Sequence, residues 1–399
     1  MNTGIWIAVY PLALLGHMAL WIALFNRLHA TNTPVLLRKV SYLLVGLALI
    51  NLPLLLVVFS GKNDWRTAFW PESFGQLPIG LLIYIPICLV FAVVTVAVWL
   101  FRKKIDHQNP RALLSSSSED FDFGSVSRVK NDSAPSLFKR IPGNQIYRCR
   151  IEKRELNLPG LHHDLQGISI AHLSDTHFNG RVCRDYFQKV IDQVNRLSAD
   201  IVVLTGDIID AEECWEWIQS VLARLRAPRG IYYVLGNHDR KIKDTDRLRE
   251  ALGAIGFQCV ADRWRTIPVG ESRIHLAGNE LPWFGKAIDQ VRALPDNASD
   301  DDLCVLLTHS PDQWSWARRL GFQLTLAGHT HGGQIRLPVV GPIISPSRHG
   351  VKYASGIFER DGQVMIVSRG ISGEEPIRLN CLPEVGLITL GGLVENAPQ

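Results

Sequence analysis

Five short clusters of acidic, amide and imidazole side chains lie in the second half of the chain, and these side chains bind divalent cations. The clusters are Asp175–Thr176–His177, Gly206–Asp207, Gly236–Asn237–His238–Asp239, Thr308–His309 and Gly328–His329–Thr330–His331. Seven of their side chains are candidate metal ligands: Asp175, His177, Asp207, Asn237, His309, His329 and His331. A single cluster of this kind carries little information, whereas five in this order form a specific pattern.

The mixture of ligands favours two neighbouring transition-metal ions. Imidazole together with carboxylate oxygen suits manganese, iron or zinc better than a site of oxygen ligands alone would. We therefore expect two divalent ions, with manganese as the first candidate and iron, zinc or magnesium as alternatives. Asp207 is the natural ligand shared by both ions, and the amide of Asn237 adds a bond without adding charge. Two such cations neutralise a phosphoester, orient it and lower the pKa of a water between them.

His238 and Asp239 are the candidate catalytic residues. If Asn237 faces a metal, His238 beside it can face the substrate. A protonated imidazole there would stabilise a phosphoryl oxygen or protonate the leaving oxygen. Asp239 is expected to orient the imidazole of His238 and to favour its protonated form.

Each cluster directly follows a short apolar run that predicts a buried strand. In the order of the clusters, the runs read IAHLS, IVVLT, IYYVL, LCVLL and LTLA. Because loops at the carboxyl ends of strands gather functional residues in α/β sheets, we expect the clusters to meet on one rim. Between the runs, amphipathic stretches such as 185–197 and 246–255 predict helices, and residues 213–225 predict a third. This alternation predicts an α/β sandwich with mixed sheets.

The pattern D-x-H, G-D, G-N-H-D, H and G-H-x-H resembles the calcineurin-like metallophosphoesterase superfamily, over roughly residues 168–390. The resemblance implies a four-layer α/β/β/α sandwich. It also implies one metal held by Asp175, His177, Asp207 and His331, and a second held by Asp207, Asn237, His309 and His329. The extended forms LSDTH and GHTHGGQ are similar to the bacterial membrane-associated branch, whose members act on phosphodiesters or on UDP-2,3-diacylglucosamine in lipid A synthesis.

Three further polar side chains are candidates for contact with substrate. Asn179 and Arg181 follow the first cluster, and Gln334 follows the last. For Asn179 and Arg181, a role in a simple turn is an equal alternative.

The first hundred residues predict three membrane-spanning helices. The segments 5–25, 40–60 and 79–101 hold no Asp, Glu, Lys or Arg, and each is long enough to cross a bilayer. A cleaved signal peptide is the alternative for the first segment, but a basic region and a small-residue cleavage site are missing. His17 inside that segment is expected to face another helix rather than to act in function.

Lysine and arginine in the connecting segments predict the orientation. Seven basic residues fall on the side that contains the first loop and the chain after the third span, and two fall on the other side. The two are Lys62 and Arg66. The positive-inside rule then places the N-terminus outside and the C-terminal domain in the cytoplasm, at the inner membrane.

Residues 102–145 contain the serine run 115–118 and basic flanks, so they predict a mobile linker. The predicted organisation is therefore a transmembrane region over 1–101, this linker, and a metallophosphoesterase domain over 146–399. A net charge of +4 gives no support for binding nucleic acid, and the seven scattered cysteines argue against a disulfide framework.

Together these features predict a membrane-anchored hydrolase acting on a phosphodiester or pyrophosphate. A nucleotide-linked lipid such as UDP-2,3-diacylglucosamine fits an enzyme held at the inner leaflet. Two alternatives remain open: a broad-specificity phosphodiesterase or phosphatase, and a non-enzymatic membrane scaffold that uses the same fold.

Overall fold

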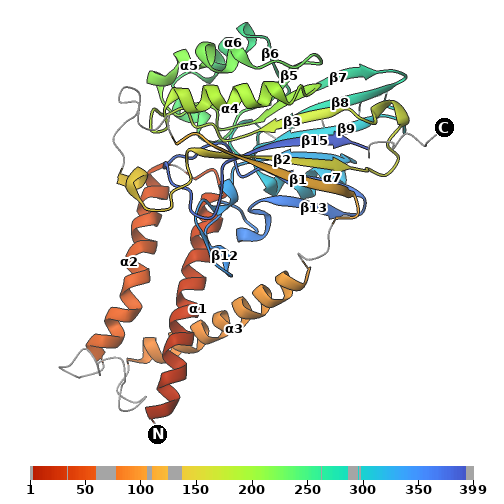
Figure 1. The fold of residues 1–399 in the computed structure, drawn as a ribbon. Helices are drawn as coiled ribbons and strands as arrows, with labels where there is room; N and C mark the ends of the chain where they lie inside the picture. Colours follow the sequence, from red (N-terminus) through yellow and green to blue (C-terminus); the bar gives the residue numbers. More distant parts are fainter. Residues whose placement is uncertain are drawn as a thin grey trace. The chain divides into compact units, whose positions relative to one another are not determined.

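The computed structural model describes residues 3–33, 35–59, 78–105, 110–124, 137–261, 263–285, 295 and 298–391. The chain divides into two compact units, residues 1–109 and 110–399 (Figure 1). The loop that carries Lys62 and Arg66, and parts of the predicted linker, lie outside the described residues.

The described part of the first unit consists of three helices: α1 (Thr3–His29), α2 (Val35–Phe59) and α3 (Ile79–Ile105). Two of them contain segments long and apolar enough to cross a membrane, Val9–His29 and Ile79–Phe101. The apolar segment of α2, Val40–Leu55, is shorter. The structure therefore supports two of the three predicted spans by length and composition.

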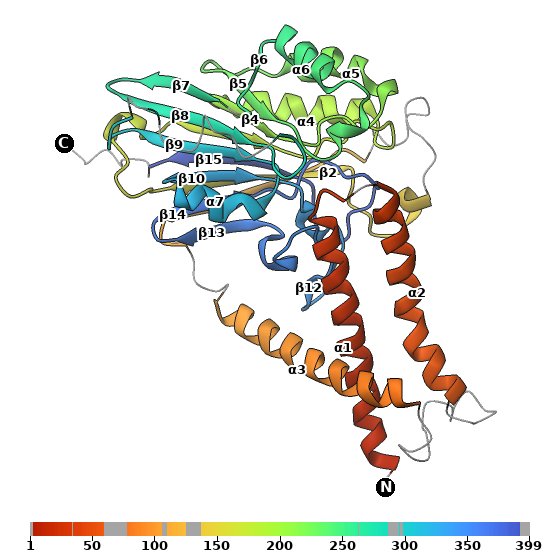
Figure 2. The ribbon, with the colours of Figure 1, turned by 180° about the vertical axis from the view of Figure 1, so that it is seen from behind.

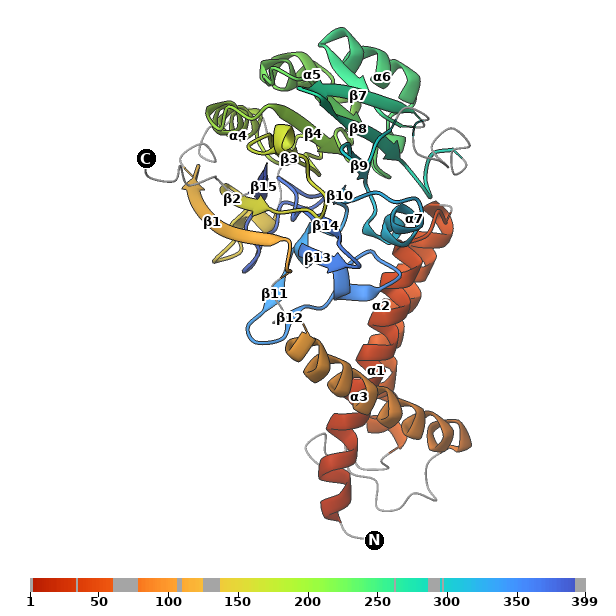
Figure 3. The ribbon, with the colours of Figure 1, turned by 90° about the vertical axis from the view of Figure 1, so that its right-hand side faces the viewer.

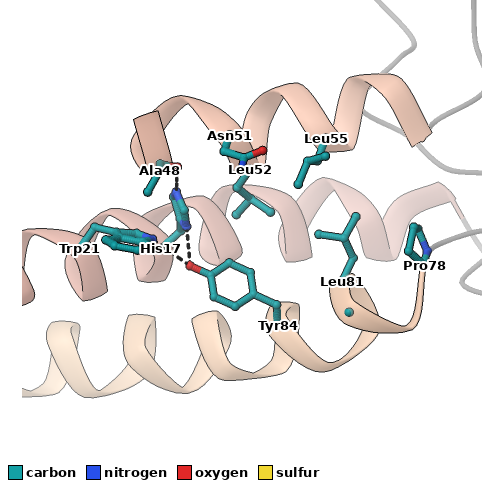
Figure 4. Close-up of a pocket in the computed structure, with 10 residues that line it drawn as sticks. His17, Trp21, Ala48, Asn51, Leu52, Leu55, Pro78, Leu81 and Tyr84 are labelled. Atoms are coloured by element: carbon teal, nitrogen blue, oxygen red, sulfur yellow. Dashed lines mark hydrogen bonds between the residues drawn. The ribbon is translucent and has the colours of Figure 1, made fainter. Parts of the chain in front are cut away.

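His17 lies between the helices of this unit, as predicted, and its ring is fixed by two hydrogen bonds (Figure 4). Its Nε2 donates to the carbonyl of Ala48 on α2 at 2.8 Å, and its Nδ1 accepts from the Tyr84 hydroxyl on α3 at 2.7 Å. The indole of Trp21 donates to the same hydroxyl at 3.0 Å. Because each buried polar group has a partner, this network is sufficiently explained as a structural link among α1, α2 and α3.

The second unit is built on two mixed β-sheets (Figures 1 and 2). The seven-stranded sheet has the order β1-β2-β15-β3-β4-β5-β6, with strands Leu113–Asp122, Arg148–Leu156, Glu384–Leu390, Ser169–Leu173, Ile201–Thr205, Ile231–Val234 and Phe257–Cys259. The six-stranded sheet has the order β13-β14-β10-β9-β8-β7, with strands Gly356–Arg360, Gln363–Val367, Leu324–Ala327, Leu303–Thr308, Ser272–Asn279 and Trp264–Val269. Parallel pairs β3–β4–β5 and β9–β10 lie inside the sheets, which confirms the predicted mixed α/β architecture.

Helices cover the outer faces of both sheets. They are α4 (Arg184–Arg196), α5 (Glu216–Ser220) and α6 (Thr245–Ala254) on the seven-stranded sheet, and α7 (Trp314–Arg319) on the other. One hydrophobic core lies between α4–α6 and their sheet, a second between the two sheets, and a third under α7. The alternation of each strand explains this arrangement: in β4, Val202 and Leu204 face the helices while Ile201 and Val203 face the other sheet.

The prediction of a mobile linker is wrong for residues 113–122, which form β1 at the edge of the seven-stranded sheet. β1 pairs antiparallel with β2, and the guanidinium of Arg150 donates to both carboxylate oxygens of Asp120 at 2.6 and 2.9 Å. Backbone pairing with one neighbour can hold an edge strand, so exposed serines and charges suit it and discourage pairing with another chain. The predicted helix 213–225 is also interrupted, since α5 is flanked by the short 3₁₀ turns Glu212–Cys214 and Leu222–Arg224.

Candidate metal centre

The five predicted clusters meet at the carboxyl ends of parallel strands from both sheets. The clusters follow β3, β4, β5, β9 and β10, in chain order. Their side chains form two groups, one of four residues and one of three. Within each group, the candidate ligand atoms all lie within 4.8 Å of one another. The expected convergence is thus observed, and both sheets supply residues to each ligand group.

The first group consists of Asp175, His177, Asp207 and His331. Nε2 of His177 lies 3.3 Å from Nε2 of His331 and 3.5 Å from Oδ2 of Asp207. Nε2 of His331 lies 3.6 Å from Oδ1 of Asp175. Three of these side chains are fully buried and that of His331 is nearly so.

The second group consists of Asp207, His309 and His329, with Asn237 beside them. Nε2 of His309 lies 3.1 Å from Oδ2 of Asp207 and 3.1 Å from Oδ1 of Asn237. Nδ1 of His329 lies 3.2 Å from the same nitrogen of His309. Asp207 therefore belongs to both groups.

These spacings fit metal ligation. Ligand atoms bound at about 2.1 Å to one ion lie roughly 3.0–3.4 Å apart in octahedral or tetrahedral geometry, close to the distances in both groups. Oδ2 of Asp207 is buried and accepts no hydrogen bond from the described residues, although imidazole nitrogens surround it. A cation in each group would satisfy the Asp207 carboxylate, so the donor set suits a pair of divalent metals.

The backbone at the candidate ligands is held in an unusual conformation. Asp175, His177, Asp207, His329 and His331 all have positive φ angles, between 44° and 71°. Such angles strain residues other than glycine and are retained where surrounding structure enforces them, often at functional sites. Gly328 permits the closest approach, because a Cβ there would lie 1.8 Å from the Ser174 hydroxyl and 2.5 Å from Oδ2 of Asp175.

Asp210, which the sequence interpretation missed, lies between the first metal group and His238. Its carboxylate accepts from Nδ1 of His177 at 3.0 Å and from Nδ1 of His238 at 2.9 Å. The first bond leaves Nε2 of His177 free to face a metal, which is the usual support for a ligating histidine. Burial opposes ionisation, but the charges of His177 and His238 hold the pKa of Asp210 well below its usual range.

The predicted role of Asp239 as the partner of His238 is wrong. Asp239 is fully buried and turns back into the fold, where it accepts from the backbone amides of Ile208, Ile209 and Gly236 at 2.8–3.0 Å. Burial, together with the Asp207 carboxylate, raises its pKa to about 7. Adjacent residues in a tight turn point in different directions, so Asp239 supports the loops while Asp210 contacts His238.

Two asparagine variants separate these roles. Asp210→Asn is expected to lower kcat about 10- to 100-fold, because it weakens the support of His177 and His238 together. Asp239→Asn is expected to lower the free energy of unfolding by about 1–3 kcal/mol, since an amide cannot accept three backbone bonds as a carboxyl can. Urea unfolding and pH–rate profiles of both variants check this. A change in the pH–rate profile confined to Asp239→Asn would contradict the assignment.

The remaining surroundings of His238 are charged. Its backbone amide donates to Oδ1 of Asp207 at 2.7 Å, and its Nε2 lies 3.8 Å from the Glu374 carboxylate. Nζ of Lys241 lies 3.2 Å from Asp210 and 2.8 Å from Glu374. His238 is 15% exposed, whereas the metal-group histidines His177 and His309 have no exposed side-chain surface, so its imidazole faces the open side of the centre.

Two of the candidate ligands, His177 and His309, have raised pKa values in the chain without metal. Burial lowers the pKa of both imidazoles, but Asp210 acting on His177 and Asp207 acting on His309 outweigh it and raise each pKa to about 9. A metal must displace these protons, which are bound below pH 9. Apparent affinity for Mn²⁺ is therefore expected to increase as pH rises from 6 toward 9, with proton release on binding. Calorimetry in buffers of different ionisation enthalpy checks this, and an affinity independent of pH would contradict it.

The three residues predicted to contact substrate make contacts within the protein instead. Asn179 and Arg181 donate to the backbone carbonyl of Glu374 at 3.2 and 2.9 Å, and Arg181 also pairs with Glu375. They therefore fix the 374–375 loop that carries a carboxylate toward His238. Gln334 has a positive φ of 54° and packs against Gly373 of the same segment.

The indole of Trp283, which the sequence interpretation also missed, lies beside the second group. The ring of Trp283 lies 5.4 Å from that of His309 and 4.7 Å from that of His329, both edge to face. Trp283 is buried, and it limits the orientations open to both imidazoles.

Comparison with known proteins gives a consistent result. The sequence pattern of calcineurin-like phosphoesterases matches residues 168–333. The uncharacterized metallophosphoesterase YkuE of Bacillus subtilis is 31% identical over 233 residues, covering 57% of this chain and 80% of that protein. Phosphodiesterase YaeI of Escherichia coli is 27% identical over 226 residues, covering 55% and 81%. UDP-2,3-diacylglucosamine pyrophosphatase LpxG of Chlamydia trachomatis is 26% identical over 296 residues, covering 60% and 88%.

Proposed function

Since this chain belongs to the calcineurin-like phosphoesterase family and is a metal-dependent phosphoester hydrolase, we propose that it is a membrane-anchored enzyme with two metal ions, acting on a phosphodiester or pyrophosphate. The observation that carries the proposal is the pair of ligand groups sharing one buried carboxylate, Asp207. Asp175, His177 and His331 would complete the first site, and Asn237, His309 and His329 the second.

When bound, two divalent cations neutralise a phosphoester and activate water for its hydrolysis. The protein's own residues then orient the imidazoles and supply a proton. Asp210 holds Nδ1–H of His177 and of His238, which orients one ligand and one candidate catalytic imidazole. With Nδ1 so engaged, Nε2 of His238 is the atom that donates a proton to the leaving oxygen. The Glu374 carboxylate lies 3.8 Å from that nitrogen.

The membrane anchor and its orientation form a separate part of the proposal. The apolar helices α1 and α3, with α2, would span the bilayer three times, and the excess of Lys and Arg would place the catalytic domain at the cytoplasmic side of the inner membrane. An enzyme held there meets substrates embedded in the inner leaflet.

We propose a nucleotide-linked lipid, of which UDP-2,3-diacylglucosamine is the leading example, as the substrate. LpxG carries that activity in its name and aligns with most of its length, and such a substrate presents a pyrophosphate to the metals and acyl chains to the bilayer. A broad-specificity phosphodiesterase is the second candidate, favoured by the similarity to YaeI over 81% of that protein. Manganese is proposed as the working metal because the ligands mix imidazole and oxygen.

One assay separates the two candidates. The full chain, purified with Mn²⁺, is incubated either with UDP-2,3-diacylglucosamine or with bis-p-nitrophenyl phosphate, and the products are identified by mass spectrometry. Formation of UMP and acyl-sugar phosphate is expected. Hydrolysis of bis-p-nitrophenyl phosphate without these products would reject the lipid substrate and retain the phosphodiesterase, whereas hydrolysis of neither would count against both.

A further inference from the structure

The segment immediately after the last metal cluster forms an exposed apolar hairpin, which the metal chemistry does not use. Strands β11 (Arg336–Leu337) and β12 (Gly341–Pro342) pair antiparallel and make a separate two-stranded sheet. Figure 3 shows this hairpin extending away from the two large sheets. We define the hairpin as residues 335–344.

Large apolar side chains are concentrated on this hairpin. Eight such side chains are strongly exposed in the described part of residues 110–399, and five of them lie here. The five are Ile335, Leu337, Val339, Val340 and Ile344, with exposures of 41%, 45%, 75%, 50% and 49%. An apolar cluster of this kind on an otherwise polar domain indicates a surface that contacts something apolar.

The tip is held in a strained shape that presents its valines outward. Val339 has a φ of 68°, which is costly for a β-branched residue, and the amide of Val340 donates to the carbonyl of Pro338 at 2.7 Å across it. Strain of this kind persists where the surrounding structure enforces it and often has a functional reason.

The base of the hairpin is firmly attached to the metal centre. The amide of Arg336 donates to the carbonyl of Leu379 at 2.9 Å, and Asn380 donates to the carbonyl of Arg336 at 3.0 Å. In the neighbouring turn, the buried guanidinium of Arg378 donates to the carbonyl of His331 at 2.8 Å. The tip is thus an exposed extension of a rigid loop that also positions a candidate ligand.

The charges around the hairpin identify its partner. Residues 331–358 contain no Asp or Glu, but they contain Arg336, Arg348 and Lys352. The Arg348 side chain is 60% exposed, although its Nε lies 3.6 Å from the buried Asp312 carboxylate, and Lys352 is exposed. An exposed apolar tip, in a segment with three basic residues and no acidic ones, matches the interface of an anionic bilayer. Because the same chain is proposed to be membrane-anchored, a bilayer is favoured over an acidic soluble protein as the partner.

We propose that the tip of this hairpin, centred on Leu337, Val339 and Val340, inserts into the interface of an anionic lipid bilayer. The inference rests on the membrane-anchored part of the proposed function. It adds a second, local membrane contact made by the catalytic domain itself. Because hydrogen bonds connect the base of the hairpin to the turn that holds His331, this contact would keep the metal centre close to the bilayer surface.

The test uses the full chain reconstituted in vesicles of phosphatidylcholine and phosphatidylglycerol. A bimane fluorophore is attached at Val339→Cys and, as the matched control, at the exposed Glu250→Cys. Glu250 belongs to α6, a helix that lies on the opposite side of the domain from the hairpin (Figures 1 and 3). Of the native thiols, six are buried and Cys259 is half-buried, so the chain without an added cysteine supplies the background.

At position 339, we expect a blue shift and quenching by doxyl-labelled lipids, both of which decrease when phosphatidylglycerol is omitted. At position 250, we expect quenching by aqueous iodide only. Iodide quenching at 339 equal to that at 250 would overturn the proposal. Protection from iodide without quenching by doxyl lipids would also overturn it and would indicate a protein surface, such as a second copy, as the partner.

Carbonate washing of the same vesicles tests the anchor independently. A chain that resists washing while residue 339 remains accessible to iodide would retain the anchor and reject the hairpin contact. A chain that washes off, but shows quenching by doxyl lipids before washing, would reject the anchor and retain the hairpin contact. Lys352→Glu provides a further check, because reversing this exposed charge is expected to reduce the quenching at 339.

Discussion

Replacing Asp207 by asparagine is expected to lower kcat/KM on the order of 10⁴-fold, because one substitution removes a ligand from both metal groups. Asp207 contributes the only carboxylate common to the two groups, and its buried Oδ2 lies 3.5 Å from His177 and 3.1 Å from His309. An amide preserves the shape of the side chain but supplies one neutral oxygen. The two cations would then lose both a ligand and the negative charge between them.

Metal content and activity of the purified variant measure this effect together. We expect Asp207→Asn to retain fewer than two ions per chain and to lose hydrolysis of bis-p-nitrophenyl phosphate. Glu250→Gln, which removes an exposed carboxylate on α6, is the matched control and is expected to keep both. A variant at Asp207 with full metal content and normal kcat/KM would show that this carboxylate is not the shared ligand.

The second large effect is expected for His238→Gln, which should lower kcat about 10²- to 10⁴-fold while leaving the metal content unchanged. His238 belongs to neither of the two ligand groups, and it reaches Asp210 through Nδ1 while its backbone amide contacts Asp207. Glutamine retains the ability to form hydrogen bonds but cannot transfer a proton at neutral pH. The loss should therefore fall on the chemical step rather than on metal binding.

Substrates with different leaving groups make the test of His238 specific. For bis-p-nitrophenyl phosphate, the leaving phenolate needs little protonation, so the effect of His238→Gln should be smaller than for a substrate with a poor leaving group. An equal loss on both substrates would argue against proton donation by His238. Loss of metal from the variant would instead show that the imidazole stabilises the centre.

The placement of the ligands was predictable because two simple signals coincided. Apolar runs such as IVVLT identify buried strands, and polar residues that follow them must emerge at strand ends. Since β3, β4 and β5 are parallel, as are β9 and β10, their ends fall on one rim. These signals place each set of ligands at the rim of its own sheet, whereas the meeting of the two sets depends on how the two sheets pack together.

The residue that orients His238 could not be predicted from the sequence in the same way. Asp239 is its neighbour in sequence, yet its carboxyl accepts backbone amides of the preceding strand loop. The true partner, Asp210, lies 28 positions earlier and reaches His238 only because the loops after β4 and β5 lie side by side. The second aspartate of the sequence GDIID was a signal that could have identified it.

The edges of the fold were also harder to predict than its centre. β1 contains four consecutive serines and is almost entirely exposed, so the hydrophobic periodicity that reveals a strand is missing there. Its pairing with β2 depends on backbone bonds and on ion pairs such as Arg150–Asp120. The exposed valines at 339 and 340 carried no sequence signal of their own, because exposure is a property of the fold.

The measurement that most directly tests the central claim is a metal titration of the full chain with simultaneous assay. The purified protein is stripped with a chelator, Mn²⁺ is added in steps, bound metal is counted by mass spectrometry, and hydrolysis of bis-p-nitrophenyl phosphate is followed. The two ligand groups sharing Asp207 predict two ions per chain at saturation, with activity appearing as the pair is completed. Full activity in the stripped protein, or saturation of activity at one ion per chain, would contradict this account.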